Sequence, residues 1–73
     1  MKTLPQIDNY TYRVTWSEDD NEFVGLCAEF PSLSYLSSTK KKALSGIHQI
    51  VADVVEDMVA NDEAIPEPRN SKH

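Results

Sequence analysis

Apolar and polar side chains alternate near the start of the chain, from Tyr10 to Trp16. Successive side chains of a strand point to opposite faces of its sheet, so strict alternation is typical of a half-buried strand. The pattern therefore predicts a strand with one face turned to a core. The residues on that face are Tyr10, Tyr12, Val14 and Trp16.

A polar turn follows this strand and carries four carboxylates, from Glu18, Asp19, Asp20 and Glu22. We name these four residues the acidic turn. The next apolar segment, Phe23 to Ala28, predicts a second strand, so that residues 10–28 form a hairpin. Gly25 lies inside this strand, where a glycine marks either a bulge or the close approach of another backbone.

Beyond the hairpin the period of the pattern changes from 2 to 3.6. Pro31 ends the second strand because it has no backbone N–H to donate, and Ser34 to Leu36 is expected as a short third strand. Ser38 or Thr39 is a suitable N-cap for a helix that runs from about Lys40 to Asn61.

This helix has a wide apolar face. On a helical wheel its apolar residues occupy an arc of roughly 180°, whereas a stripe that only covers a sheet need be about 100° wide. The surplus predicts that part of the face contacts something beyond its own sheet, and a homodimer is the first expectation. The face that should form the core or the dimer contact contains Leu44, Ile47, Val51, Val54, Val55, Met58 and Val59.

A last short strand is expected at Ile65, where Pro66 and Pro68 limit it to a sheet edge. The predicted class is α+β, with a small antiparallel sheet of three to four strands and one long helix on one face, in the order βββαβ. Residues 1–9 are expected as an N-terminal arm, 10–68 as a single domain, and 69–73 as a disordered tail.

Length and charge narrow the classes of protein. A chain of 73 residues with one cysteine is a single small domain without a disulfide framework, so it depends on tight packing or on a partner chain. It contains no apolar run that could span a membrane and no export signal, which favours the cytoplasm. Its net charge of −5 disfavours binding to nucleic acid and favours a basic protein partner.

Few residues suggest chemistry. The acidic turn lacks the spacing of a calcium loop, and a solvated hairpin tip is the favoured interpretation. Cys27 and His48 would need contact and an oxyanion site to act as a nucleophile pair, and the sequence supplies no such site. His48 is expected as a half-buried residue at the border of the apolar arc. We therefore expect no catalytic residue, no metal and no cofactor.

Two charged clusters remain on the helix. Lys40, Lys41 and Lys42 lie at its start, where they serve either phosphate binding or, as we favour, solubility. The polar side carries three acids that are expected to form a solvated acidic face rather than a pair with raised pKa. We name these three the helix acids: Asp53, Glu56 and Asp57.

The ordered set of motifs resembles the HicB-like antitoxin family. The resemblance rests on the aromatic alternating strand, the acidic turn, the second strand, the segment Glu29-Phe30-Pro31-Ser32-Leu33, the capped helix with Ala43-Leu44, and the closing Ile65-Pro66-Glu67-Pro68. It covers residues 10–68. It implies a partial ribonuclease H-like fold without a nuclease site, in a short form that lacks the C-terminal DNA-binding module of longer members.

The resemblance also implies a function: an antitoxin that binds and neutralises a small basic mRNA-cleaving toxin of the HicA type. The expected contact residues are those of the acidic turn (Glu18, Asp19, Asp20, Glu22), those of the loop and third strand (Phe30, Pro31, Leu33, Tyr35), and the helix acids (Asp53, Glu56, Asp57). The alternatives are a stand-alone small dimeric module with a regulatory or structural role and, less favoured, a nuclease on the same fold.

Overall fold

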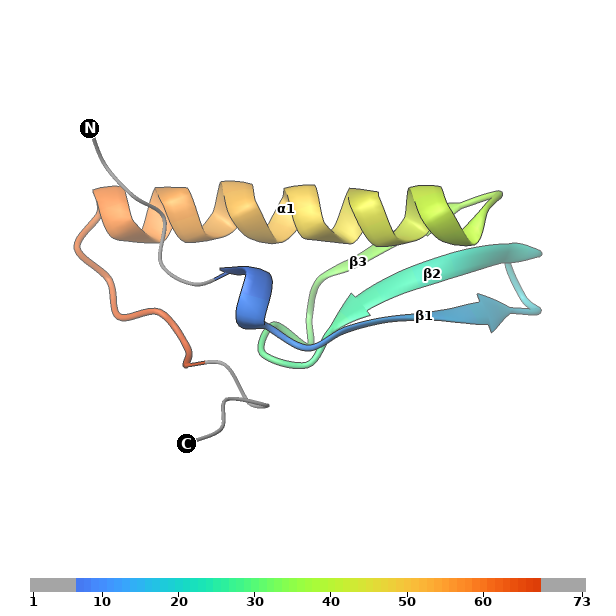
Figure 1. Ribbon diagram of the computed structural model, residues 1–73, viewed down its shortest axis with the longest axis horizontal. Coiled ribbons are helices and arrows are strands. Elements are labelled where there is room, and N and C mark those ends of the chain that lie inside the picture. The colour runs from blue at the N-terminus through green and yellow to red at the C-terminus, as the bar shows by residue number, and fades with distance from the viewer. Residues whose placement is uncertain (1–6, 68–73) are drawn as a thin grey trace.

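The structure, a computed structural model, describes residues 7–67 and consists of one antiparallel sheet under one long helix (Figure 1). The sheet has three strands in the order β1-β2-β3, and the helix lies along one face of it. This is the predicted α+β class. The elements are the 3-10 helix η1 (Ile7–Asn9), β1 (Tyr12–Ser17), β2 (Glu22–Cys27), β3 (Ser34–Ser37) and α1 (Lys40–Ala60).

The first strand begins two residues later than predicted and ends one residue later, at Ser17. Tyr10 does not belong to it, because the Tyr10 N–H donates to the Ile7 carbonyl oxygen at 3.2 Å and so closes η1. The alternation is present, but burial falls along it. Tyr10 is buried, Tyr12 and Val14 are half-buried, and Trp16 is 46% exposed. The apolar face of β1 is therefore only partly covered by α1.

Gly25 in β2 marks a close approach of the helix, not a bulge. Its pairing with Val14 in β1 and with Tyr35 in β3 is continuous. A Cβ atom added at Gly25 would clash with the Ala43 carbonyl oxygen and lie 2.8 Å from Ile47 Cγ2. The missing side chain thus lets α1 lie directly over β2.

The helix begins as predicted. Thr39 has an extended backbone and is the N-cap, and its hydroxyl accepts the Lys42 N–H at 3.1 Å. The buried spine of α1 recurs at every fourth residue. Of the predicted face, Ile47, Val51 and Val55 are fully buried, Val54, Met58 and Val59 are half-buried, and Leu44 is 45% exposed.

The end of α1 is a Schellman motif. Asn61 is the C-cap, and Asp62 follows in the left-handed region with a φ of 62°. The Glu63 N–H donates to the Met58 carbonyl oxygen at 2.8 Å, and the Asp62 N–H donates to the Val59 carbonyl oxygen at 3.1 Å. The helix therefore ends one residue before the predicted limit.

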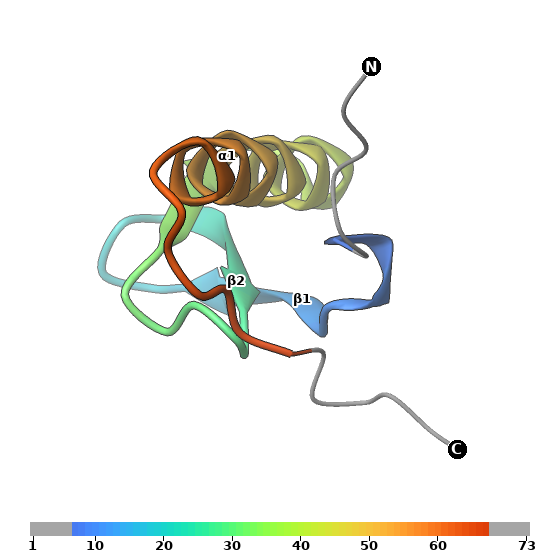
Figure 2. The ribbon, with the colours of Figure 1, turned by 90° about the vertical axis from the view of Figure 1, so that its left-hand side faces the viewer.

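The predicted closing strand at Ile65 is wrong for the described residues, because residues 63–67 carry no strand. Residues 61–67, which we name the closing segment, run from the end of α1 down past the end of the sheet (Figure 2). The Pro66 carbonyl oxygen accepts the Tyr10 hydroxyl at 2.6 Å. Part of the expected N-terminal arm is ordered as η1, whereas residues 1–6, Pro68 and the expected tail over 69–73 lie outside the described residues.

Candidate functional site

The two acidic sets lie in different parts of the molecule. The acidic turn joins β1 to β2 at the end where α1 begins, whereas the helix acids lie in the second half of α1 (Figure 1). Glu18, Asp19, Asp20 and all three helix acids are exposed, and Glu22 is half-buried. The predicted contact residues therefore do not form one continuous site.

The helix acids form a compact acidic patch. Asp53 lies three residues before Glu56 and four before Asp57, and residues at these spacings are neighbours on a helix surface. No cation among the described residues lies within ion-pairing distance of them. Since α1 has no basic residue in its last turn, the carboxylate of Asp57 there meets the negative pole of the helix dipole without a cation in that turn.

The loop between β2 and β3 is turned partly toward the core. Phe30 and Leu33 are half-buried and pack against the core cluster, and Phe30 meets the Tyr10 ring edge-on at a centroid distance of 5.7 Å. Pro31 is exposed, and Tyr35, 40% exposed, lies against Gly46 of α1. Of the four predicted contact residues in this loop and in β3, Pro31 and Tyr35 are the ones a partner can reach most easily.

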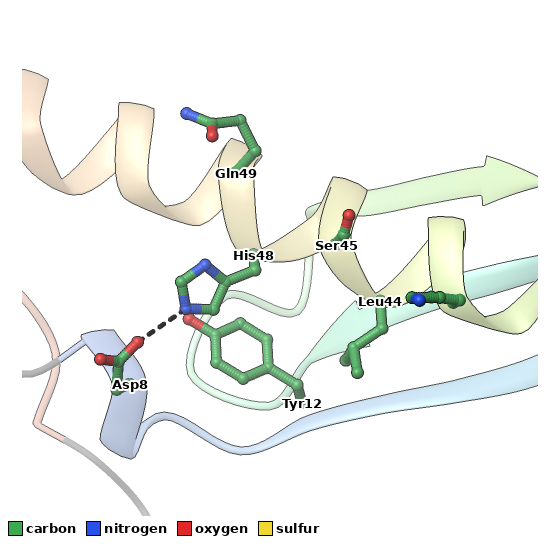
Figure 3. Close-up of a pocket in the computed structure, with 7 residues that line it drawn as sticks. Asp8, Tyr12, Leu44, Ser45, His48 and Gln49 are labelled. Atoms are coloured by element: carbon green, nitrogen blue, oxygen red, sulfur yellow. Dashed lines mark hydrogen bonds and ion pairs between the residues drawn. The ribbon is translucent and has the colours of Figure 1, made fainter.

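A groove of about 570 Å³ runs between α1 and the β1 side of the sheet (Figure 3). We name it the His48 groove. Its helix side begins with Lys41 in the first turn of α1 and passes through the exposed Leu44. Its lining residues are Asp8, Tyr12, Lys41, Leu44, Ser45, His48 and Gln49.

The polar contacts of the groove join η1 to α1 and β1. The His48 Nε2 atom lies 2.9 Å from Asp8 Oδ1, and the His48 and Tyr12 ring centroids are 5.1 Å apart. The Tyr12 hydroxyl donates to the Ile7 carbonyl oxygen at 2.7 Å. Burial raises the pKa of Tyr12, and the nearby thiol of Cys27 and carboxylate of Asp8 add to that shift. The groove thus holds an Asp–His pair over a neutral phenol.

Cys27 and His48 have different partners, so the structure does not form the nucleophile pair considered from the sequence. The Cys27 thiol is buried and lies 3.4 Å from Glu29 Oε1, while His48 faces Asp8. Burial raises the pKa of the Cys27 thiol, and the adjacent Glu29 side chain adds to that rise through its hydrogen bond and its charge. The same buried carboxylate accepts the Thr11 N–H at 2.9 Å, so Glu29 fixes the start of β1 to the end of β2.

Sequence reasoning overlooked Asp8 and Glu29 as organising residues. Asp8 is separated from His48 by 40 positions, and no local pattern links them. A possible signal for Glu29 was its place directly after a buried strand, since an acid there must find hydrogen-bond donors. His48 is half-buried, as expected. At the start of α1, the Lys40 ammonium lies 5.9 Å from the Phe23 ring centroid.

Other kinds of site are not evident in the part of the chain that the structure describes. Residues 7–67 contain no group of three or more His, Cys, Asp or Glu side chains that could hold a metal ion. Among the same residues, no helix has the length and apolar character needed to cross a membrane. Comparisons with protein-family models, curated proteins and solved structures find no match to this chain.

Proposed function

We propose that this chain is an antitoxin-like protein that binds a small basic partner and neutralises it. The HicB-like resemblance makes an mRNA-cleaving toxin of the HicA type the candidate partner. The observation that carries the proposal is the patch of helix acids: three exposed carboxylates on consecutive turns without a described cation nearby. A basic partner would supply the missing counter-charges and would be steered toward the patch as it approaches.

The patch is unfavourable for the isolated fold. Like charges three or four residues apart on a helix destabilise it by about 0.2–0.5 kcal/mol per pair. Asp57, in the last turn of α1, also opposes the helix dipole, at a cost of about 0.3–1 kcal/mol. Natural proteins retain such locally unfavourable choices chiefly at functional sites, which supports a binding role for Asp53, Glu56 and Asp57.

The test is a search beside this gene for a reading frame that encodes a small basic protein, followed by co-expression of the two, with growth of the host and co-purification as readouts. The wild-type chain is expected to restore growth and to co-purify. The triple variant Asp53→Asn, Glu56→Gln, Asp57→Asn is expected to do neither. Because the substitutions relieve repulsion, the same variant should melt at a higher temperature than the wild type, which separates lost binding from lost folding.

A matched control removes the same number of charges elsewhere. Asp62→Asn, Glu63→Gln and Glu67→Gln together also change the net charge from −5 to −2, and this control should still restore growth. If both triple variants fail equally, net charge alone matters and the patch has no special role. If the wild-type chain neither binds nor protects against the neighbouring protein, the antitoxin proposal is wrong.

The stand-alone dimeric module remains the second candidate. It is favoured by a separate observation, the partly exposed apolar surface beside β1, which includes Trp16 and Leu44. A chain that self-associates while the gene has no basic neighbour would support this alternative.

A further inference from the structure

The outer edge of β1 has no described strand beside it, and η1 lies beyond the start of the strand (Figure 2). The Ala28 N–H donates to the Thr11 carbonyl oxygen at 2.9 Å, which fixes the phase of the β1–β2 ladder. Thr11 and every second residue after it bond to β2, because hydrogen-bonded and non-bonded pairs alternate in an antiparallel ladder. The backbone N–H and C=O groups that point outward, with no described strand beside them, belong to Tyr12, Val14 and Trp16.

This edge lacks the usual protection against pairing. Natural edge strands are short, or carry proline, bulges or several charges. β1 is six residues long, is continuous in register, contains no proline and has Arg13 as its only charged residue. The opposite edge of the sheet, β3, has four residues. β1 is therefore the edge better suited to accept another strand.

We propose that β1 pairs with β1 of a second copy of this chain, antiparallel and centred on Val14, to give one six-stranded sheet. This inference is independent of the antitoxin proposal. A two-fold axis at Val14 pairs Tyr12 with Trp16 of the second copy, and all outward backbone groups then meet partners in register. Cross-strand aromatic pairs of this kind add to the stability of a sheet.

The spacing of the helices fits the exposed side chains. α1 lies over β2 at Gly25, so three strand spacings, about 14 Å, would separate the two helix axes. Directly packed helices lie about 8–10 Å apart, so the dimer needs large side chains to fill the space between its helices. The His48 groove opens there, and Leu44, 45% exposed, and Trp16, 46% exposed, are available to fill it.

The charges of the groove are also self-complementary. Asp8 lies at the η1 end of the groove (Figure 3). Lys41 lies two helical turns before His48 in α1, toward the start of the helix. A two-fold axis reverses the groove of the second copy, so that Lys41 of each copy is brought toward the 87% exposed side chain of Asp8 of the other. Such reciprocal contacts are what an isologous interface requires.

The protein has enough surface to form an interface of standard size. A standard interface buries about 800 Å² per partner, roughly 15% of the 5248 Å² surface of this protein. β1 lies on the broad side of the molecule that faces the viewer in Figure 1, and the His48 groove is lined by residues of η1, β1 and α1. The second copy thus fits this surface in backbone pairing, in the filling of space and in charge.

The experiment is analytical ultracentrifugation of the full chain across the micromolar range. The expected species has twice the 8.2 kDa mass of one chain. Val14→Pro removes an outward N–H that β2 does not use, and it should weaken dimerisation about tenfold or more, because the symmetric dimer loses two hydrogen bonds. Leu36→Pro is the matched control, since Leu36 has its N–H on the outer edge of β3.

A second pair of variants avoids proline. Leu44→Glu should produce monomers, whereas Leu36→Glu, at a residue 42% exposed on β3, should remain dimeric. Circular dichroism of each variant shows whether it is folded. A third set tests the charges: Asp8→Lys and Lys41→Asp should each weaken the dimer, and the double variant should restore it.

Two results would overturn the proposal. One is a monomeric wild-type chain at the highest concentration. The other is a dimer that tolerates Val14→Pro and Leu44→Glu but dissociates with the Leu36 variants, because the interface would then lie at β3. Neither result depends on the basic partner, so failure here leaves the antitoxin proposal standing, and the reverse also holds.

Discussion

Replacing Gly25 by alanine should be the most damaging single-methyl change among the described residues. Its backbone is ordinary strand, without positive φ, so alanine meets no conformational penalty and would normally suit a strand better than glycine. The added Cβ instead clashes with the Ala43 carbonyl oxygen and lies 2.8 Å from Ile47 Cγ2. A helix backbone cannot rotate out of the way as a side chain can, so α1 must lift from β2.

The size of the effect follows from this geometry. Overpacking usually costs about 1–3 kcal/mol, and a clash with backbone places Gly25→Ala near the upper end, at about 3 kcal/mol. A 73-residue chain has a total stability of about 4–11 kcal/mol. In a domain of this size, 3 kcal/mol corresponds to a melting temperature lowered by roughly 12–24 °C.

Gly46→Ala is the matched comparison. An added Cβ there lies 2.6 Å from Tyr35 Cγ and overlaps the ring, but that ring is 40% exposed and can swing into solvent. The ring loses about 1 kcal/mol of burial, while alanine gains about 1 kcal/mol of helix propensity over glycine, so the net change should be near zero.

Thermal and urea unfolding of both variants at equal protein concentration measure the difference. The expected outcome is a large loss of stability for Gly25→Ala and little change for Gly46→Ala. A Gly25→Ala protein within 1 kcal/mol of the wild type, on the scale of overpacking costs, would refute the close approach of α1 to β2. A Gly46→Ala protein less stable than Gly25→Ala would contradict the reasoning about which neighbour can move.

Three further predictions concern buried polar groups. Tyr10→Phe removes the hydroxyl that donates to the Pro66 carbonyl oxygen and should cost about 1 kcal/mol in urea unfolding; an unchanged midpoint would show that water replaces the bond. Burial raises the pKa of Tyr12. The neutral Tyr12 phenol therefore stabilises the fold fully below the unfolded pKa of about 10, and this stabilisation is lost as the pH rises toward the higher folded pKa. Tyr12→Phe should flatten the alkaline limb of the curve of stability against pH. Cys27, 2% exposed and with its pKa raised by burial, should react with a disulfide reagent only as fast as the chain opens, and Gly25→Ala should accelerate that reaction; rapid labelling of the native wild type would contradict its burial.

The periodic parts of the chain were predictable because burial on one face produces a regular pattern. The alternation around Val14 and the wide face of α1 both appear in the structure at the predicted places. The ends of the elements were harder to predict from the sequence. The hydrogen bond from the Tyr10 N–H to Ile7 shortens β1, and no period-2 pattern reveals a 3-10 turn placed directly before a strand.

Contacts between distant residues account for the other differences. The expected strand at Ile65 is absent because Pro66 has no N–H for a ladder and its carbonyl oxygen instead accepts a phenol from the other end of the domain. The His48 groove could not be predicted from the sequence for a similar reason. Nothing near Asp8 in sequence indicates a histidine 40 positions away, and the open edge of β1 depends on a strand order that the pattern does not specify.

The bond between Tyr10 and Pro66 joins points 56 positions apart. A force applied to the two chain ends would reach this contact and the contacts that hold η1, the Asp8–His48 pair and the bond from the Tyr12 hydroxyl to Ile7, before it reaches the β1–β2 ladder. Pulling would detach the closing segment, with its bond to Tyr10 and the packing of Ile65 against the core, while β1 still pairs with β2. Partial opening of this kind needs less free energy than global unfolding. The chain should therefore yield to mechanical tension in two steps, with a weak first step at the closing segment and a stronger second step at the sheet.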